Sequence, residues 1–486
     1  MVDSNYLSPP LYAALAMIAS YYVNSQLILF LLVIFLIIIY SFISSLHIFI
    51  DIRKILVISL SLIIGFSLGI FARQGKDNSL QMGLLQENII AVSGILIEDP
   101  RSLQAGLGYG ILDLQVTVTH NGIRSSAKGE LTVFFPEDSI ADLKEFGRAS
   151  TLYLEGSFGR GNSSNVFYAA SVHITTPPPV IEAFRTNLRH LILERFSYMQ
   201  GSNSEWGNFA SALLLGVRDN LDTNFTDSFR NSGTSHILAL SGMHLAVISL
   251  LLSLMLKPLL GIRYAALAGA VFICLYVFLA GAQTSLIRSL IMYLLGVFAL
   301  WTSLKTKGLT LLATAFILQL LFQNKSGTSI SFMLSYLALF GMITLGKSIY
   351  NLLKGKLPEI LSSSLSFSLA AFLVTSPLVA YYFNTLRPIG IITGIIIAPL
   401  STLFMILSLA ALLFSFVPLP IWSFFAFLLD FLYGVINNIV SVSSLVPGIN
   451  ISEPFWIMLF SIIIFVLLIL FAAWDEKRRL KIEVFN

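Results

Sequence analysis

The chain has few charged residues and almost no cysteine. Asp, Glu, Lys and Arg make up 11% of its 486 residues, against about 25% in an average soluble protein. This scarcity excludes an ordinary soluble globular protein. The one cysteine, Cys274, excludes an intrachain disulfide and a cysteine-based metal site. The hydrophobic fraction of 56% instead predicts a polytopic membrane protein.

A cleavable signal is also missing from the beginning of the sequence. The first ten residues contain Asp3 and no Lys or Arg, whereas a secretory signal has a basic start. We therefore expect the first apolar run to be retained.

Apolar runs near the length needed to cross a bilayer, roughly 17 to 25 residues, fall into two blocks. They predict about 11–12 transmembrane helices, depending on whether the short run 11–23 is counted. The first block covers 11–23, 27–50 and 55–71. The second comprises runs at 235–256, 264–284, 285–301, 309–323, 329–346, 360–383, 388–416, 420–446 and 455–473.

The basic residues near the ends of these runs predict the orientation, since Lys and Arg collect on the cytoplasmic side. The tail after the last run carries Lys477, Arg478, Arg479 and Lys481, which places the C-terminus in the cytoplasm. The basic residues of the other loops cannot all lie on one side of the membrane, so we take the orientation that places most of them in the cytoplasm. It leaves the polar insert between the two blocks on the extracytoplasmic side.

The insert has the periodicity of strands. Residues 112–119 alternate strictly between apolar and polar, which indicates a half-buried strand. Similar runs lie at 88–97, 130–135, 151–158 and 166–174, separated by turn residues. Five short strands fit a small β-barrel such as the OB-fold, and a generic β-sandwich fits the pattern nearly as well.

A helix with arginines on one face is expected directly after the insert and its closing Pro177-Pro178-Pro179. Apolar residues recur there at helical spacing, while Arg185, Arg189 and Arg195 occupy another face. The pattern predicts a basic amphipathic helix on the membrane surface. Its arginines would contact lipid headgroups or, alternatively, the phosphates of a passing polyanion.

Polar residues stand at the entrance of the second block. Residues 235–244 read Ser-His-Ile-Leu-Ala-Leu-Ser-Gly-Met-His, and ionisable groups at membrane depth indicate a functional site. The pair Ser241-Gly242 predicts a break in the helix, the usual device for building a translocation site. The histidines would either line a path or brace the bent helix.

Arg288 is the leading candidate for a cation in the membrane. It lies about three residues inside a predicted span, beside Gln283, Thr284 and Ser285. The polar neighbours favour a cavity, although an arginine near a span end can also reach the interface as an anchor.

Several segments of the second block resemble the ComEC family, the DNA-uptake channels of bacterial competence. Residues 213–219 read Leu-Leu-Leu-Gly-Val-Arg-Asp, and residues 229–244 run from Phe-Arg-Asn-Ser-Gly-Thr into the polar entrance. Further on, Ser285-Leu-Ile-Arg-Ser289 and Ser331-Phe-Met-Leu-Ser-Tyr-Leu-Ala338 are similar to the family's next motifs. Order and spacing both agree, as do Pro377 and Ala398-Pro399-Leu400 further along the chain.

The resemblance implies a channel in the bacterial inner membrane that passes one strand of DNA into the cytoplasm. The sequence departs from many members, because it stops at Asn486 without a metallo-β-lactamase-like domain, and its six histidines form no His-x-His-x-Asp-His cluster. We therefore expect no nuclease activity, no cofactor and no metal. The resemblance leads us to expect DNA, the lipid bilayer, a DNA-receptor protein, an ATP-driven motor and a separate nuclease as partners.

These readings combine into one set of expected domains and path residues. The domains are N-terminal helices (1–75), an OB-like domain (76–179), surface helices (180–234), the channel domain (235–474) and a cytoplasmic tail (475–486). The candidate residues of the DNA path are Arg218, Asp219, Ser235, His236, Ser241, Gly242, His244, Ser285, Arg288 and Ser335.

Two other classes of function stay open. One is a transporter or flippase for another anionic or lipid-linked polymer. The other is an intramembrane hydrolase that uses Ser241, or a zinc held by the histidines. His236 and His244 would lie roughly 12 Å apart along an unbroken helix, too far for both to bind one zinc at about 2 Å. A break at Ser241-Gly242 could shorten that distance.

Overall fold

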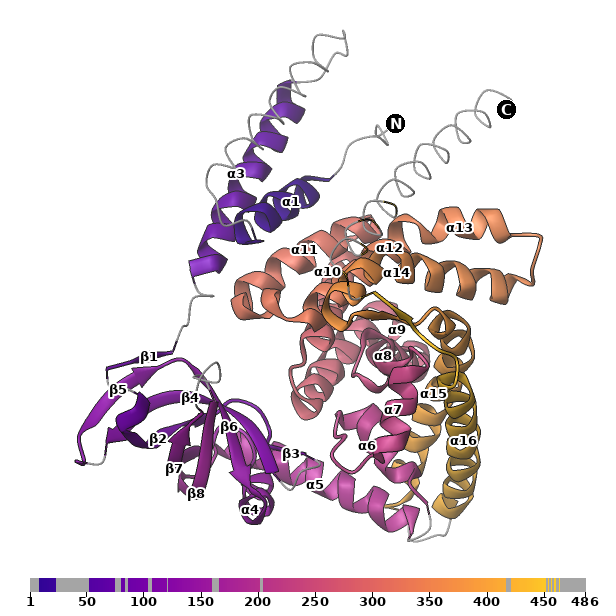
Figure 1. Cartoon of the computed structure of the whole chain (residues 1–486). Coiled ribbons are helices and arrows are strands. Elements are labelled where there is room, and N and C mark those ends of the chain that lie inside the picture. The colour runs from indigo at the N-terminus through magenta and orange to yellow at the C-terminus, as the bar shows by residue number, and fades with distance from the viewer. Residues whose placement is uncertain are drawn as a thin grey trace.

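A computed structural model describes residues 8–22, 52–74, 80–83, 86–103, 107–119, 121–159, 166–201, 204–416 and 421–451, with residues 453, 456, 459 and 463. Figure 1 shows a sheet domain beside a larger domain of helices, with helix α5 running between them. The predicted runs 27–50 and 455–473, and the tail 475–486, lie wholly or mostly outside the described residues.

The sheet domain contains the five predicted strands and three shorter ones. The strands are β1 (Gln81–Met82), β2 (Ile89–Leu96), β3 (Arg101–Leu103), β4 (Leu107–Thr119), β5 (Arg124–Lys128), β6 (Glu130–Pro136), β7 (Thr151–Phe158) and β8 (Val166–Thr176). Strand β2 pairs with β4 and β7, and β4 also pairs with β6. Strand β8 pairs with β7 and, in parallel, with β6. The pairings β2–β4–β6–β8–β7–β2 therefore return to their starting strand.

The alternating residues of these strands form the core of the sheet domain, as the sequence predicts. Val92, Leu112, Val133, Leu152 and Phe167 are fully buried in one cluster. Their polar neighbours in sequence face outward, because successive side chains of a strand point to opposite faces. Helix α4 (Ile140–Phe146) connects β6 to β7 and buries Leu143 in the same core.

The larger domain is helical. Its elements are α5 (Val180–Gln200), α6 (Trp206–Leu215), α7 (Thr223–Asn231), α8 (Ser235–Leu238), α9 (Gly242–Ala280), α10 (Thr284–Thr302), α11 (Gly308–Phe322), η4 (Asn324–Thr328), α12 (Ile330–Thr344), α13 (Gly346–Leu353), α14 (Glu359–Phe383), α15 (Ile389–Phe414) and α16 (Ile421–Ser444), with a small sheet of β9 (Thr385–Leu386) and β10 (Ile449–Asn450). One large apolar cluster, centred on Phe209, Phe225 and Phe404, joins α6 and α7 to α15 and α16.

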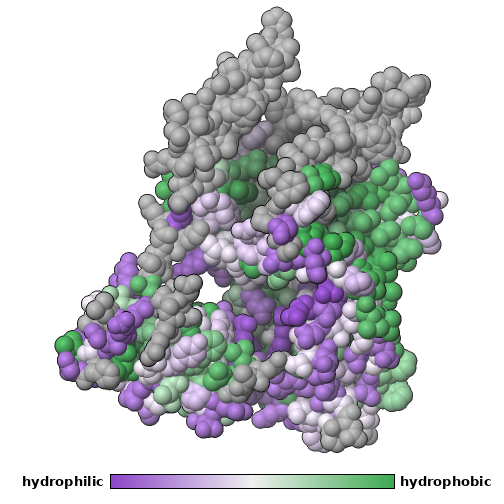
Figure 2. Space-filling view, viewed as in Figure 1, coloured by the Kyte–Doolittle hydropathy of each residue, from purple (hydrophilic) through white to green (hydrophobic). Residues whose placement is uncertain are grey.

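Five helices among the described residues are long and apolar enough to cross a membrane: α9, α10, α14, α15 and α16. The pair α12 and α13, bent by 47°, would make a sixth. Large apolar side chains such as Phe424, Phe427 and Phe431 of α16 are exposed, and Figure 2 shows a continuous hydrophobic surface on the helical domain. The chain is thus a helical membrane protein with a sheet domain, and the larger number of 11–12 spans stays a prediction.

Helix α9 corresponds to two predicted spans. At Gly261 the backbone leaves the helical conformation (φ 74°, ψ 168°), which only glycine adopts readily. The segments on either side therefore match the predicted runs 235–256 and 264–284, except that the first begins at Gly242. Leu245 of the first segment shares a cluster with Ile273 and Val277 of the second, so the two segments pack as a hairpin.

The N-terminal helices are attached to the end of α11. Helix α1 (Pro9–Tyr22) packs on α3 (Ile52–Gln74) and on α11, where Met17 and Tyr21 are buried with Phe316. The hydroxyl of Tyr21 donates to the carbonyl of Asn324, and that of Tyr22 donates to the carbonyl of Gly327. Both acceptors belong to η4, so the first helix of the chain fixes a loop roughly 300 residues away in sequence.

The prediction for α5 as a basic surface helix is wrong for two of its three arginines. The side chain of Arg185 is completely buried and that of Arg189 is 13% exposed, because both lie against the sheet domain and the end of α9. The guanidinium of Arg195 lies 5.2 Å from the ring centre of Phe416. The side of α5 that carries Val180, Ile181 and Phe184 is exposed instead.

Candidate functional site

The predicted break before the long helix is present. Ala239 and Ser241 have extended backbones, so that the short α8 stops and α9 starts anew at Gly242. Ser241 caps α9, because its hydroxyl accepts from the N–H of Met243 at 3.3 Å. His244 closes the reciprocal bond, since its Nδ1 accepts from the N–H of Ser241 at 3.0 Å. This capping box satisfies two backbone donors that a helix start leaves free.

Helix α10 brings Arg288 to the same place. Arg288 is 8% exposed, and its Nη1 donates to the carbonyl of Ser335 in α12 at 2.8 Å. Its guanidinium carbon also lies 5.8 Å from the ring centre of Tyr336. Arg288 is therefore held inside the helical domain between α10 and α12.

Gly242 permits the close approach of α9 to α10. A Cβ atom added to Gly242 would stand 2.6 Å from the Oγ of Ser289 and 3.5 Å from the Nη2 of Arg288. On the other side of the break, the hydroxyl of Ser285 donates to the carbonyl of Leu240 at 2.6 Å. The break and the first turns of α10 thus form one polar contact region.

Two polar atoms of this region have no hydrogen-bond partner among the described residues. They are Nε2 of His244, a residue 1% exposed, and Nε of Arg288. Because Nδ1 of His244 accepts a backbone N–H, the neutral ring carries its proton on Nε2. Both atoms are therefore donors, and a buried donor without an acceptor costs about 1–3 kcal/mol. An acceptor, such as water or an anionic oxygen, would satisfy either donor.

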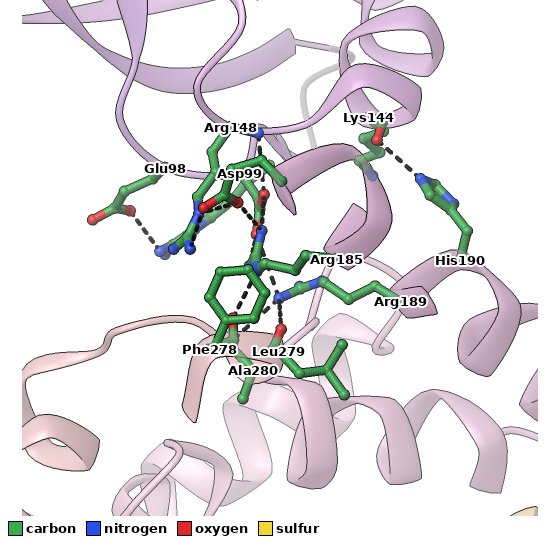
Figure 3. A network of polar contacts seen from close by, with 12 residues as sticks. Glu98, Asp99, Lys144, Arg148, Arg185, Arg189, His190, Phe278, Leu279 and Ala280 are labelled. Carbon is green, nitrogen blue, oxygen red and sulfur yellow. Dashed lines mark hydrogen bonds and ion pairs between the residues drawn. The ribbon is translucent and has the colours of Figure 1, made fainter. Parts of the chain in front are cut away.

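A second polar network joins the sheet domain to the other end of α9 (Figure 3). Asp99, between β2 and β3, accepts two hydrogen bonds from Arg185, at 3.0 and 2.6 Å. Arg185 also donates to the carbonyl of Phe278, and Arg189 donates to those of Leu279 and Ala280. These carbonyls end α9, where a helix leaves acceptors free and favours a cation.

The charges of this network determine the ionisation of Asp99. Burial alone would raise the pKa of Asp99, but the hydrogen bond from Arg185 and the charges of Arg189 and Arg185 lower it to about 2. Arg148 adds its backbone N–H to Asp99 and pairs with Glu182 at 2.8 Å. Asp99 is therefore ionised at neutral pH, and its ion pairs with Arg185 and Arg189 fix the sheet domain on α5 and α9.

Arg218 and Asp219 extend this contact along the loop between α6 and α7. Asp219 accepts from the N–H of Ser102 in β3 at 3.2 Å and pairs with Lys144 of α4 at 2.7 Å. Burial, and then the charge of Arg101, lower the pKa of Arg218. Arg218 belongs to the helical domain and is thus also close to Arg101 of the sheet domain.

The structure brings together some of the predicted path residues and separates others. Ser241, Gly242, His244, Ser285 and Arg288 lie in one region, and Ser335 joins it through its carbonyl oxygen. Asp219 faces the sheet domain instead. Ser235 and His236 are exposed on α8, outside this hydrogen-bonded group of the described residues.

Sequence reasoning missed two groups of residues. One is the partner set of the arginines, Asp99 and Glu182. The other is Gln319 of α11, which is fully buried, donates to the carbonyl of Thr284 at 2.8 Å and accepts from Tyr336 at 2.9 Å. A glutamine in an apolar run is a polar group at membrane depth, and that rule could have found it.

Comparison with known proteins assigns most of the helical domain to a protein family. A family model described as Competence protein matches residues 213–478, a range that contains the break, Arg288 and all five long apolar helices. The chain belongs to the competence protein family. The resemblance to ComEC proteins is thereby confirmed.

Two relatives have been compared with this competence protein. ComE operon protein 3 of Bacillus subtilis (strain 168) is 28% identical over 282 residues, which are 55% of this chain and 34% of that protein. An uncharacterized protein of Aquifex aeolicus (strain VF5) is 27% identical over 299 residues, 59% of this chain and 69% of that protein. The chain thus aligns with about a third of the Bacillus relative. No solved structure matches this competence protein.

Proposed function

We propose that this chain forms a membrane channel that passes single-stranded DNA into the cytoplasm during natural transformation. The observation that carries the proposal is the presence of two buried donors, Nε2 of His244 and Nε of Arg288, beside the break that precedes α9 in a competence protein. A DNA strand carries an anionic oxygen at each nucleotide, and such oxygens are acceptors for these donors. The proposed membrane is the bacterial inner membrane, with the sheet domain outside.

The geometry of Arg288 supports a phosphate ligand. Among the described residues, its guanidinium donates one hydrogen bond, from Nη1 to the carbonyl of Ser335, so that other donors of the fork stay available. A guanidinium presents its donors in a plane that matches phosphate oxygens. Ser241 and His244 hold the start of α9 in place by their capping box, and a Cβ atom on Gly242 would lie 3.5 Å from Nη2 of Arg288, so the guanidinium lies beside the break.

The strand circuit supports an OB-like fold for the sheet domain. Five strands pair in the order β2–β4–β6–β8–β7 and back to β2, with a parallel pair β6–β8 and a helix between β6 and β7. The OB-fold, a small barrel of five strands, is a common scaffold for oligonucleotide binding. In this proposal the domain stands on the extracytoplasmic side, where the incoming strand arrives.

The chain needs partners for the rest of the process. Its sequence contains the pattern Gly-x-x-x-x-Gly-Lys-Ser once, at residues 341–348. Those residues lie at the end of α12 and the start of α13, whereas a phosphate-binding loop of this pattern follows a strand. We therefore expect an ATP-driven step to come from a separate motor. The described residues contain no group of three or more His, Cys, Asp or Glu that could hold a metal ion. We expect the purified chain not to cut DNA with magnesium, manganese or zinc, and a separate nuclease and a DNA receptor to act with it.

A hydrolase is the second candidate, because the hydroxyl of Ser241 lies 3.1 Å from Nδ1 of His244. A serine and a histidine at this distance can form a nucleophile and its base. Two observations argue against a hydrolase. The hydroxyl is engaged as the cap of α9, and Nε2 of the histidine has no carboxylate partner among the described residues to orient the ring.

DNA uptake by variants of Arg288 tests the channel. We expect Arg288→Leu to insert normally and to lose most uptake per inserted molecule, because leucine suits the bilayer and offers no donor. Arg288→Lys should retain part of the activity, since lysine keeps the charge without the planar fork. The matched control is Arg263→Leu, which removes an exposed arginine that donates a hydrogen bond to the hydroxyl of Ser303 at 3.3 Å.

Uptake of labelled DNA is measured relative to the amount of protein in the membrane. Full uptake in Arg288→Leu would contradict the proposed path. Normal uptake together with hydrolysis of an ester that depends on Ser241 would favour the hydrolase. Loss of transport of another anionic polymer, with DNA entry unchanged, would favour the transporter.

A further inference from the structure

One row of the sheet domain carries a cation and three aromatic side chains. Arg101 of β3 stands opposite Tyr109 of β4, Tyr109 stands opposite Phe134 of β6, and Phe134 stands opposite Tyr168 of β8. Residues opposite one another on paired strands share a face of the sheet. The four side chains therefore form a line across four strands, which we call the aromatic row.

The aromatic row faces outward. The residues that alternate with it, Phe135 and Phe167, are completely buried in the core of the domain, so the row lies on the opposite face. Tyr168 is 46% exposed. Phe134 and Tyr168 are stacked, with centres 5.3 Å apart and planes 16° from parallel, and Tyr109 is tilted against Phe134 at 5.9 Å.

The row ends next to the helical domain. Ser102, the neighbour of Arg101, donates its N–H to Asp219 of the α6–α7 loop, and the charge of Arg101 acts on Arg218 in the same loop. Glu130 begins β6 and lies on the same outward face as Phe134. It pairs with Lys325 of η4 at 2.7 Å. Figure 2 shows the surface hollowed between the two domains, with hydrophilic residues on the helical side.

We propose that Tyr109, Phe134 and Tyr168 stack the bases of incoming single-stranded DNA, and that Arg101 and Arg218 receive its phosphates at the end of the row next to the helical domain. This proposal rests on the proposed function and adds the place where the strand is first held. Aromatic rings stack any base, so the platform suits a strand of arbitrary sequence. Along the strand circuit, β4 and β6 are the second and third strands, whose face binds oligonucleotides in OB-folds.

The charges around the row are compatible with this ligand. Arg101 is paired with Glu98 at 2.9 Å, but both side chains are about half exposed, and an exposed pair of this kind is weak enough to exchange for a phosphate. Glu130 is neutralised by Lys325. The bases would cover the apolar rings while the phosphates remain at the cationic end and in solvent.

Binding by the full-length chain in lipid nanodiscs tests the row. The probes are a fluorescent oligothymidylate, an abasic deoxyribose-phosphate oligomer of the same length and a soluble glycan strand. We expect the oligothymidylate to bind most tightly. Tyr168→Ala should weaken its binding by about 5- to 150-fold, the usual effect of losing one stacked base. Tyr168→Phe should bind like the unchanged chain, because stacking needs the ring and not the hydroxyl.

The matched control is Tyr153→Ala, on β7, a partly exposed tyrosine that stands opposite Ser93 and His173 outside the row. Equal binding of the abasic oligomer, or no loss in Tyr168→Ala, would overturn the proposal. Preferred binding of the glycan through the same ring would overturn it too and assign the row to a carbohydrate. If any of these results occurs while Arg288→Leu still abolishes uptake, the base-stacking role of the aromatic row is wrong, whereas the proposed channel function is retained.

Discussion

Replacing Asp99 by Asn should loosen the sheet domain from α5 and α9. The change leaves the side chain of Arg185, which is completely buried, without its bidentate carboxylate. Removing one partner of a buried ion pair costs about 3–5 kcal/mol. Glu182 remains 3.7 Å from Arg185, so we expect the lower end, about 3 kcal/mol, which corresponds to about 150-fold in the equilibrium between docked and undocked domains.

A thiol placed in the contact measures this equilibrium. Thr186 is 4% exposed, its hydroxyl has no hydrogen-bond partner among the described residues, and it faces Gly147 of the sheet domain. Thr186→Cys therefore places a thiol that a reagent reaches only when the domains separate. The background carries Cys274→Ser, which removes the native exposed cysteine. When closing is faster than labelling, the labelling rate follows the undocked population.

We expect Asp99→Asn to raise the labelling rate of this thiol by about 100-fold or more. A second change, Arg185→Met, should recover much of the loss, because it removes the unpaired buried charge while keeping apolar bulk. A labelling rate within twofold of the unchanged chain in Asp99→Asn would refute the reasoning. It would mean that the domains are held by other contacts.

Three further predictions concern acid, the break and the sheet domain. The pKa of Asp99 is lowered to about 2 from 3.8, so the stabilisation that ionised Asp99 provides is present above about pH 4 and is lost as the pH falls towards 2. Hydrogen exchange of α5, corrected for intrinsic rates, should therefore be constant from pH 7 to 5 and rise only below about pH 4. A rise already at pH 6 would contradict this. Gly242→Ala should displace Ser289 and lower uptake per inserted molecule, whereas Gly296→Ala, with open space around it, should not; equal uptake in both would show that the close approach is not needed. The fragment 86–177 should fold alone and give a β-rich far-ultraviolet circular dichroism spectrum, and a helical or unfolded spectrum would argue against an independent domain.

Local patterns predicted the elements that depend on local physics. The five long strands follow from strict alternation, because one face of each strand is buried, as at Leu112 and Leu152. The break before α9 follows from Ser241-Gly242, since serine caps a helix start and glycine allows close approach. The short strands β1, β3 and β5 escaped because pieces of two to five residues are too short to show a period.

The surroundings of the arginines could not be predicted, because they depend on distant residues. Asp99 lies 86 positions from Arg185 in sequence, and the carbonyls of α9 that accept from Arg189 are about 90 positions away. A helical face of arginines is equally compatible with lipid headgroups and with a buried acidic partner. Only the fold distinguishes the two. The same limit applied to Arg288, whose partner is a backbone carbonyl in another helix.

The attachment of α1 to η4 has a consequence for the biogenesis of the protein. The hydroxyl of Tyr21 reaches the carbonyl of Asn324, 303 positions later in the chain. At a synthesis rate of about 5–20 residues per second, the first helix is made roughly 15 to 60 seconds before its partner exists. During that interval Met17 and Tyr21, which are buried in the finished protein, have only lipid, α3 or the insertion machinery to cover them. The N-terminal helix therefore completes its packing late, and a truncated chain that ends before α11 would leave it as a target for membrane quality control.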